Sequence, residues 1–462
     1  MLSQQAAAEV LNAALASGGE FAEIFLEDRR DNALVLQDNR IETVHSGRIH
    51  GAGIRVYVGL NAVYTYTNAT DRDGLLRCAR QAAAAVQEYR SLAGIKPFYV
   101  PQRENIHHIK LLPSAVAARK KAEVLRMANA AARDVSAEIA QVICSYKDSE
   151  QDVLICNSDG LFTTDRRVYT RLACQVVASS GMENQTATES PGAMMGYELF
   201  ETHVDPEASA RSAAETAIRM LHASQCPSGI MPVVIDNGFG GVIFHEACGH
   251  SLEATSVAFG MSEFCGKLGQ QIAAPCVTAI DDGTLANEWG SENIDDEGTP
   301  TNKLVLIENG VLKNYMIDRL NGKRMGMAPT GSARRQSYAF APTSRMRNTY
   351  IAPGNDADDE IISSMGDGLY AAKMGGGSVN PATGEFNFAV QEGYLVKDGK
   401  IAEPVRGASL IGKGADILMK IDRVGRNMKM AQGMCGSLSG SVPTNVGQPM
   451  IRVSGITVGG RA

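Results

Sequence analysis

The chain has 462 residues, of which 44% are hydrophobic and 21% charged, a composition typical of a globular protein that buries a sizeable core. Its formal net charge of −7 and the lack of a Lys/Arg cluster argue against a nucleic-acid partner. No run of about 18 apolar residues occurs, and the N-terminus lacks the features of a secretory signal, so we expect no membrane association.

Residues 1–95 predict an α+β unit. An Ala-rich segment predicts a helix at 3–17, and a second helix is expected at 73–89. Between them, alternating apolar and polar residues predict five short strands, at 21–28, 32–39, 40–47, 51–59 and 61–67. Residues 91–112 contain prolines and no periodic pattern, so we interpret them as a linker in which His107 and His108 are solvated.

The same order of elements recurs in residues 113–225. A helix at 115–135 precedes strands within 138–179, and another helix follows at 205–224. Helix, antiparallel strands and helix, occurring twice, indicate a duplicated unit, although the two copies share little residue identity.

Residues 226–462 have a different character, with many glycines and short apolar runs. The "ENG" at 308–310 and the "KDG" at 397–399 separate apolar runs and predict hairpin turns. One apolar helix is expected at 242–254, inside a β-rich domain. The predicted fold class is therefore α+β, with a duplicated helix and antiparallel-sheet region at the N-terminus and a β-rich C-terminal domain that carries this helix.

Cysteine usage indicates the redox environment. Nine cysteines are scattered through the chain, and none forms a C-x-x-C pair. This is typical of a reduced protein whose thiols are mostly small buried groups, so we expect a cytoplasmic location without a disulfide framework. One thiolate could still be a metal ligand.

The predicted helix carries "HEACGH", in which Glu246 follows His245 and His250 comes five residues after the first histidine. Residues five apart on a regular helix differ by about 140° in direction, so the two imidazoles would diverge. A π-bulge would return both to one face, and Gly249 is a plausible place for it. Glu246 would then lie beside a metal ion without binding it. Asn237 is expected to cap the helix.

Two histidines make an incomplete catalytic metal site, because catalytic zinc usually has three protein ligands and a water. Local sequence does not choose the third ligand. Glu253 is equally suited to ligation and to a contact with an imidazole N–H. The candidates are Cys248, Glu253, Cys265, Cys276 and Cys435.

Three other patterns have simpler interpretations. Residues 407–414, "GASLIGKG", resemble a phosphate-binding loop but lack its final Ser/Thr, which argues against nucleotide binding. The glycines of 374–381 favour a turn or bulge in a sheet over a ligand site. Four arginines lie in 334–347; they are expected to be solvated or structural, although Arg334, Arg335, Arg345 and Arg347 could instead hold a peptide backbone or a substrate carboxylate.

Over nearly its whole length, the chain resembles the TldD/PmbA (TldE) family of zinc metalloproteases. The resemblance rests on "HEACGHSLEA" and on C-terminal blocks at 328–354, 375–396, 407–425 and 434–460. In the last block, "CGSLSGSVP" departs from the family's more usual C-G-K-x-G-Q-x-V-P, which leaves the role of the missing lysine and glutamine open.

The resemblance implies a catalytic, TldD-type subunit, because PmbA-type partners typically lack the histidine motif. It implies that His245, His250 and Cys435 bind Zn²⁺, and that Glu246 is the general base. Arg334, Arg335 and Arg345 are the candidate substrate contacts. It further implies an active site enclosed in a dimer, either with a PmbA/TldE-type partner or as a homodimer, that admits unfolded or short peptides.

The leading hypothesis is therefore a zinc-dependent peptidase. One alternative is a non-catalytic regulatory or partner subunit in which the histidines are structural. Another is a zinc amidohydrolase that acts on small amides and ignores polypeptides. Metal content and substrate size distinguish the three.

Overall fold

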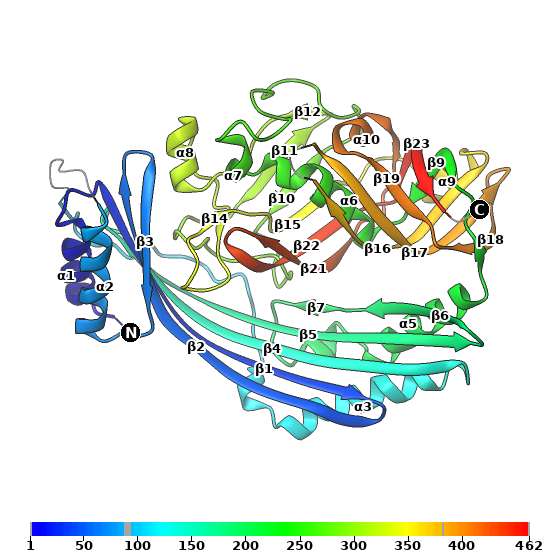
Figure 1. Ribbon diagram of the computed structural model, residues 1–462, viewed down its shortest axis with the longest axis horizontal. Helices are drawn as coiled ribbons and strands as arrows, with labels where there is room; N and C mark the ends of the chain where they lie inside the picture. The colour runs from blue at the N-terminus through cyan, green and yellow to red at the C-terminus, as the bar shows by residue number, and fades with distance from the viewer. Residues whose placement is uncertain (1, 87–93, 381–382, 461–462) are drawn as a thin grey trace.

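A seven-stranded antiparallel sheet forms the first half of the computed structural model, which describes residues 2–86, 94–380 and 383–460 (Figure 1). Six strands follow the order β3-β2-β1-β4-β5-β6, and β7 pairs with β5. The strands are β1 (Phe21–Gln37), β2 (Arg40–Val58), β3 (Asn61–Thr67), β4 (Ile139–Asn157), β5 (Phe162–Ser180), β6 (Glu183–Glu189) and β7 (Gly192–Ala193).

The two predicted repeats share this sheet, because β1 of the first pairs with β4 of the second from Glu23↔Asn157 to Gln37↔Ile143. The prediction of five short strands in the first repeat is wrong, since β1 and β2 continue through the polar segments between them. Asp28 forms an ion pair with Arg48 of β2. Such cross-strand ion pairs accommodate charged residues in the middle of these strands, so each strand continues without a turn.

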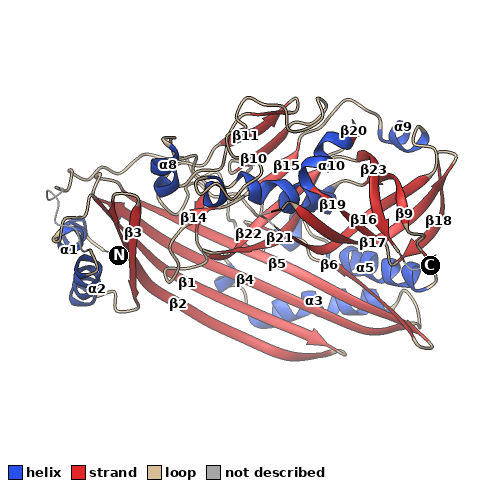
Figure 2. Cartoon of the chain, turned by 45° about the horizontal axis from the view of Figure 1, so that its top comes forward, coloured by secondary structure: helices blue, strands red, loops and turns tan. Residues whose placement is uncertain are grey.

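Helices cover one face of the sheet (Figure 2). Even-numbered residues of β1 pack against them: Ile24 lies in the cluster with α1 and α2, and Leu34 and Leu36 lie in the cluster with α3 and α5. The helices are α1 (Gln4–Leu15), α2 (Arg72–Ala84), α3 (Ala118–Arg133), α4 (Leu199–Thr202) and α5 (Pro206–Leu221), with a 3-10 turn, η1, at Pro113–Ala115. The end of the predicted second helix, 87–89, lies outside the described residues.

The predicted linker is partly buried. Residues 91–93 lie outside the described part of the chain, and His107 is only 2% exposed, so its expected solvation is wrong. Its Nδ1 accepts a hydrogen bond from the backbone N–H of Asn287. Burial lowers the pKa of His107 to about 4. His108 is exposed, as predicted.

The C-terminal half contains two larger sheets and a two-stranded ribbon of β13 and β14. One sheet has the order β12-β11-β10-β15-β22-β21, and the other has the order β16-β9-β23-β19-β17-β18-β8 with β20 beside β23. Pairing of β16 with β17 closes five strands of the second sheet into a barrel. The strands are β8 (Ser224–Gln225), β9 (Gly229–Ile235), β10 (Ala279–Asp282), β11 (Lys303–Glu308), β12 (Val311–Leu312), β13 (Ala333–Arg334), β14 (Thr343–Ser344), β15 (Asn348–Ile351), β16 (Gly368–Val379), β17 (Glu385–Lys397), β18 (Lys400–Arg406), β19 (Ser409–Lys413), β20 (Ile421–Val424), β21 (Lys429–Ser437), β22 (Gly440–Gln448) and β23 (Ile451–Gly459).

Both hairpin turns predicted in this half are confirmed. Asn309 and Gly310 connect β11 and β12, and Asp398 and Gly399 connect β17 and β18, all four with positive φ. Short helices complete the half: α6 (Val242–Phe244), α7 (Ala254–Val257), α8 (Arg319–Met325), α9 (Asp358–Ser363) and α10 (Gly414–Lys420). The predicted α+β class, with a β-rich C-terminal region, is confirmed.

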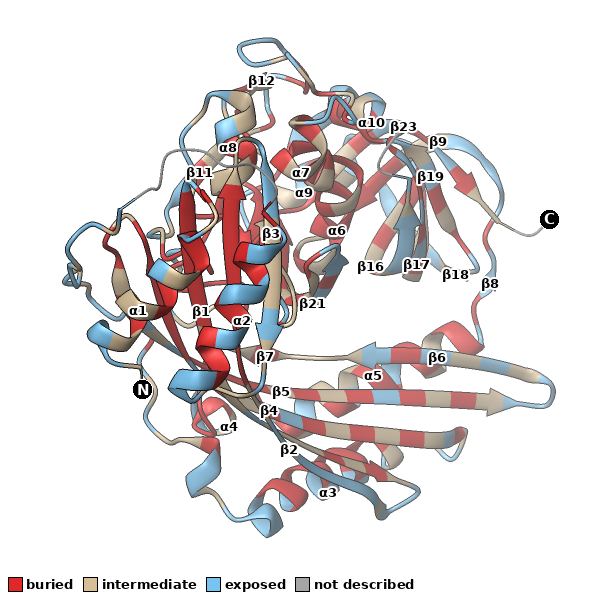
Figure 3. Cartoon of the chain, turned by 60° about the vertical axis from the view of Figure 1, so that its left-hand side comes forward, coloured by how far each residue is buried: buried red, intermediate tan, exposed pale blue. Residues whose placement is uncertain are grey.

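The C-terminal half packs on the face of the large sheet opposite the helices. Odd-numbered residues face it: Phe25 and Ile155 pack with Ile294, and Arg55 forms an ion pair with Glu297. Figure 3 shows buried residues along the start of β1, where the halves meet, and alternating burial further along β4 and β5. Among the helices of the described residues, none has the length and apolarity to cross a membrane.

Candidate metal centre

The histidine segment follows β9 and a 3-10 turn, η2 (Gly238–Gly241), and lies in the core of the C-terminal half. Apolar residues Val242, Ile243 and Phe244 of α6 are buried there, which fixes the start of the segment. The expected side-chain cap by Asn237 is absent, because its side-chain amide donates to the backbone oxygen of Asn427 instead.

The predicted π-bulge is confirmed. Residues His245–Gly249 form a π-helical turn, η3, followed by a 3-10 turn, η4 (His250–Leu252). The wider turn absorbs the extra residue between the histidines. A Cβ at Gly249 would displace the side chain of Met346, which packs against the turn here. Gly414 is more strictly required, because a Cβ there would overlap the backbone oxygen of Ala247.

Two imidazoles and one sulfur meet at this turn. The Sγ of Cys435 lies 3.3 Å from Nε2 of His245 and 3.3 Å from Nε2 of His250. All three ligand atoms lie within 4.8 Å of one another, a grouping expected of residues that bind one metal ion. Cys435 comes from β21, which is 185 residues away from His250 in the sequence.

Charge at the cluster favours a thiolate. Burial would raise the pKa of the Cys435 thiol, but the imidazoles of His245 and His250 lower it to about 3. Burial also opposes protonation of His250, yet Glu253 and the sulfur raise the pKa of His250 overall. A thiolate is the form of cysteine that binds metals.

Two carboxylates flank His250 in different ways. Oε2 of Glu253 lies 3.1 Å from Nδ1 of His250, so Glu253 orients the ring from the side away from the sulfur. Oε2 of Glu246 lies 3.7 Å from Nε2 of His250, and the Glu246 side chain is 28% exposed to solvent. Glu246 is therefore the carboxylate of the two that a substrate or a water molecule can reach.

The remaining candidate ligands lie elsewhere. Cys248 is buried in the apolar core, where burial raises its pKa. The thiol of Cys265 faces the backbone oxygen of Val257, and the thiol of Cys276 faces that of Ile421. Of the five candidates, the structure brings Cys435 beside both histidines, and it places Glu253 in contact with the ring of His250.

Three family models match the chain: the PmbA/TldA metallopeptidase domain 1 at residues 22–86, the central domain at 111–221 and the C-terminal domain at 228–460. The chain belongs to the PmbA/TldD metallopeptidase family. The family resemblance and the expected metalloprotease are thus confirmed.

Members of the family with similar sequences come from bacteria and archaea. A "Metalloprotease TldD homolog" of Haemophilus influenzae is 35% identical over 452 residues, which cover 96% of this chain and 93% of that protein. A "Metalloprotease" of Methanothermobacter thermautotrophicus is 34% identical over 444 residues, which cover 96% of each chain.

Two solved structures share the fold. A putative modulator of DNA gyrase from Thermotoga maritima has a TM-score of 0.81 at 22% identity, over 99% of this chain and 100% of the other. TldE from Thermococcus kodakarensis has a TM-score of 0.78 at 18% identity, over 98% and 99%.

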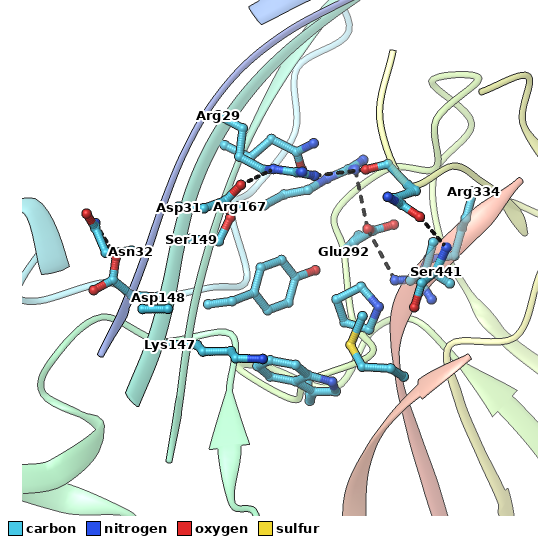
Figure 4. Close-up of a pocket in the computed structure, with 18 of the residues that line it drawn as sticks. Arg29, Asp31, Asn32, Lys147, Asp148, Ser149, Arg167, Glu292, Arg334 and Ser441 are labelled. Carbon is cyan, nitrogen blue, oxygen red and sulfur yellow. Dashed lines mark hydrogen bonds and ion pairs between the residues drawn. The ribbon is translucent and has the colours of Figure 1, made fainter. Parts of the chain in front are cut away.

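The three arginines that we predicted as substrate contacts are buried, and protein groups accept hydrogen bonds from their terminal nitrogens. Figure 4 shows Glu292 between Arg167 and Arg334, at 3.3 and 3.4 Å. Arg335 donates to the backbone oxygen of Asp296, and Arg345 donates to the backbone oxygen of Cys435. Arg345 therefore supports the strand that carries the family's cysteine, and substrate binding by these arginines stays a prediction.

A pocket of about 570 Å³ opens beside the cluster. Glu246 and His250 line it, together with Ser378 and Val379 at the end of β16. The glycine-rich segment at 374–381 was predicted to form a turn or bulge in a sheet. In agreement, its residues 374–379 form the irregular, bulged end of β16 beside the site, and residue 381 lies outside the described part of the chain. Sequence reasoning missed Thr255, Met261 and Leu438, which also line this pocket; Leu438 lies within the family's closing block, which was the one available signal.

Proposed function

We propose that the protein is a zinc-dependent peptidase that hydrolyses unfolded or short peptides. The observation that supports this best is the convergence of His245, His250 and Cys435, with Glu246 at the open side of the cluster. The histidine turn and β21 are far apart in the sequence, yet their polar side chains meet in an otherwise apolar core. Burial of polar groups costs free energy unless they are paired or bind a metal ion.

The three side chains fit a zinc ion. Imidazole nitrogen and thiolate sulfur are ligands that zinc favours, and three protein ligands are the usual number at a catalytic site. The low pKa of Cys435 keeps its sulfur in the thiolate form that zinc binds. When bound, zinc supplies Lewis-acid assistance to amide hydrolysis.

Glu246 moves the proton. Its carboxylate is exposed to the pocket, so it can take a proton from the attacking water and then give it to the leaving amine. Glu253 and Arg345 act through other residues: Glu253 orients the imidazole of His250, and Arg345 holds the backbone of Cys435.

An extended peptide has a surface to bind beside this cluster. Strand β9 pairs with β16 only at Leu369, Tyr370 and Ala371, so the end of β16 at Ser378 and Val379 has no β9 partner. A peptide added there would use main-chain hydrogen bonds, which tolerate many side chains. Only an unfolded or short chain can present such a strand.

We also propose that the protein assembles as a dimer, either with a PmbA/TldE-type subunit or with a second copy. The shared fold with TldE from Thermococcus kodakarensis supports this assembly. The proposed cytoplasmic location rests on the nine cysteines, seven of which are buried and all of which are free thiols.

Metal analysis of the purified protein tests the proposal. We expect about one zinc per chain, and loss of both zinc and peptide cleavage on chelation. Cys435→Ala should lose the zinc, whereas Cys276→Ala, at an exposed thiol, should keep it. Zinc retained in Cys435→Ala would contradict the ligand set.

Substrate size separates the peptidase from the other hypotheses. The peptidase cleaves unfolded polypeptides, and a small-molecule amidohydrolase cleaves only small amides. A metal-free protein that still binds a partner chain would instead indicate a non-catalytic subunit.

A further inference from the structure

An apolar pocket of about 380 Å³ adjoins the metal pocket. Its walls come from both halves of the molecule: β3 contributes Ala62 and Tyr64, and α8 contributes Leu320. The other apolar walls are Phe259, Met261, Ala341, Pro342 and Leu438.

This apolar pocket lies directly beside the metal pocket, since Thr255, Met261 and Leu438 line both. Leu438 lies in the turn between β21 and β22, three residues after Cys435. At roughly 3.3 Å per residue, Leu438 is therefore at most about three residues of an extended peptide away from Cys435.

Its walls expose large apolar side chains to solvent. The exposed fractions are 55% for Phe259, 58% for Met261 and 79% for Leu438. Single exposed apolar residues are ordinary, but a group of them around a concave site marks a binding surface. The guanidinium of Arg324 stacks on Phe259, 4.4 Å from the ring centre, and holds that ring in place.

The polar groups at the pocket are engaged by the protein. Asp318 accepts hydrogen bonds from Asn321 and Ser344, and Arg324 donates to Asn321 and to the backbone oxygen of Leu60. The hydroxyl of Tyr64 donates to the backbone oxygen of Tyr338. What the pocket offers a ligand is therefore apolar surface.

We propose that this pocket receives a large apolar side chain of the peptide substrate, such as leucine or phenylalanine, next to the bond that is cleaved. The inference rests on the proposed peptidase activity and adds a side-chain preference to it. The N-terminal sheet takes part in substrate selection through Ala62 and Tyr64 of β3.

Ala62→Phe tests the inference without touching the metal cluster. Ala62 is exposed on β3, and a phenyl ring there would fill the pocket from the wall that belongs to the N-terminal sheet. Ala130→Phe is the matched control, because it makes the same change at an exposed alanine of α3 that lines neither pocket. A mixed peptide library is digested, and the residues that flank each cleaved bond are identified by mass spectrometry.

We expect the wild type and Ala130→Phe to cleave at least tenfold faster next to leucine or phenylalanine than next to serine, and Ala62→Phe to lose this preference while still cleaving next to small residues. No apolar preference in the wild type, or an unchanged preference in Ala62→Phe, would overturn the inference and leave the peptidase proposal intact.

Binding provides a second measurement that does not depend on turnover. Fluorescence anisotropy compares a labelled leucine peptide and its serine analogue on Glu246→Gln, with and without Ala62→Phe. We expect tighter binding of the leucine peptide, lost in the double variant; equal binding of both peptides overturns the inference even if no peptide is ever cleaved.

Light scattering checks the assembly, and a change of oligomeric state in Ala62→Phe would mean that another chain covers the pocket.

Discussion

Glu246 and Glu253 lie on either side of His250, yet their surroundings give them different roles. Both line the pocket, but Glu253 is buried against Nδ1 of the ring, whereas the side chain of Glu246 is 28% exposed. The sequence predicted Glu246 as the base but left Glu253 open between ligand and ring contact. Three-residue spacing on a distorted turn does not determine which atom of the imidazole a carboxylate meets.

Replacement of Glu246 by glutamine keeps the shape and removes the proton acceptor. We expect kcat to fall by roughly 10² to 10⁴ with unchanged zinc content. Glu263→Gln is the control, because Glu263 lies outside the pocket. Peptide turnover is measured beside metal analysis of the same samples, and full activity in Glu246→Gln would remove this residue from the mechanism.

The buried imidazole of His107 should make the free energy of unfolding depend on pH. Burial lowers the pKa of His107 in the folded protein to about 4, below the ordinary value of 6.5. Between pH 6.5 and 4, His107 is therefore protonated in the unfolded chain but neutral in the folded protein. Stability is therefore lost as the pH falls from 6.5 to 4, by about 3 kcal/mol in total.

Urea unfolding at several pH values measures this loss. His107→Gln should lack it, so the difference in unfolding free energy between the wild type and this variant should shrink as the pH falls. His108→Gln, at the exposed neighbour, should follow the wild type. A pH-independent difference for His107→Gln would contradict the prediction.

At the scale of single elements, the π-helical turn is the part of the site that the sequence specified best. The five-residue spacing between the histidines requires a distortion if both rings are to face one ion, and Gly249 is where the side chain is missing. Strand lengths were predicted less well, because cross-strand ion pairs such as Asp28–Arg48 let charged residues continue β1 and β2.

Gly249→Ala tests the turn. Its methyl group would displace Met346, and we expect a stability loss of about 1–3 kcal/mol and weaker zinc binding. Zinc affinity by competition with a chelator and thermal unfolding measure the two effects. Met346→Ala in the same chain should recover part of the affinity, whereas Gly455→Ala, where a Cβ has room, should resemble the wild type. Unchanged affinity in Gly249→Ala would mean that the turn does not set the geometry.

At the scale of the whole molecule, buried ion pairs join the large sheet to the C-terminal half. Arg167 of β5 contacts Asp296 at 2.8 Å and Glu292 at 3.3 Å, and Arg335 contacts Glu23 of β1 at 3.2 Å. Removing one partner of such a cluster leaves an uncompensated buried charge, which costs about 3–5 kcal/mol.

Arg167→Met should therefore destabilise the protein by that amount, and Arg166→Met, at the half-exposed neighbouring position, by at most about 1 kcal/mol. Calorimetry is the measurement. We expect one unfolding transition for the wild type, because the halves share these pairs. Two well-separated wild-type transitions, or equal losses in both variants, would contradict this view.

Long-range assembly is the part that sequence reasoning reached only through family resemblance. Local chemistry left five candidates for the third ligand, because convergence of β21 on the histidine turn depends on strands of both C-terminal sheets that lie between them in the sequence. The burial of His107 and of the three arginines has the same origin, since their partners lie in distant segments.

The order of the three proposed zinc ligands along the chain is also the order in which they are synthesised. During translation His245 and His250 are synthesised long before Cys435, and β22, which pairs with the strand of Cys435, is synthesised last of these. A growing polypeptide therefore passes through most of its synthesis without the complete set of proposed zinc donors, and we expect it to cleave peptides only after its final strands have folded.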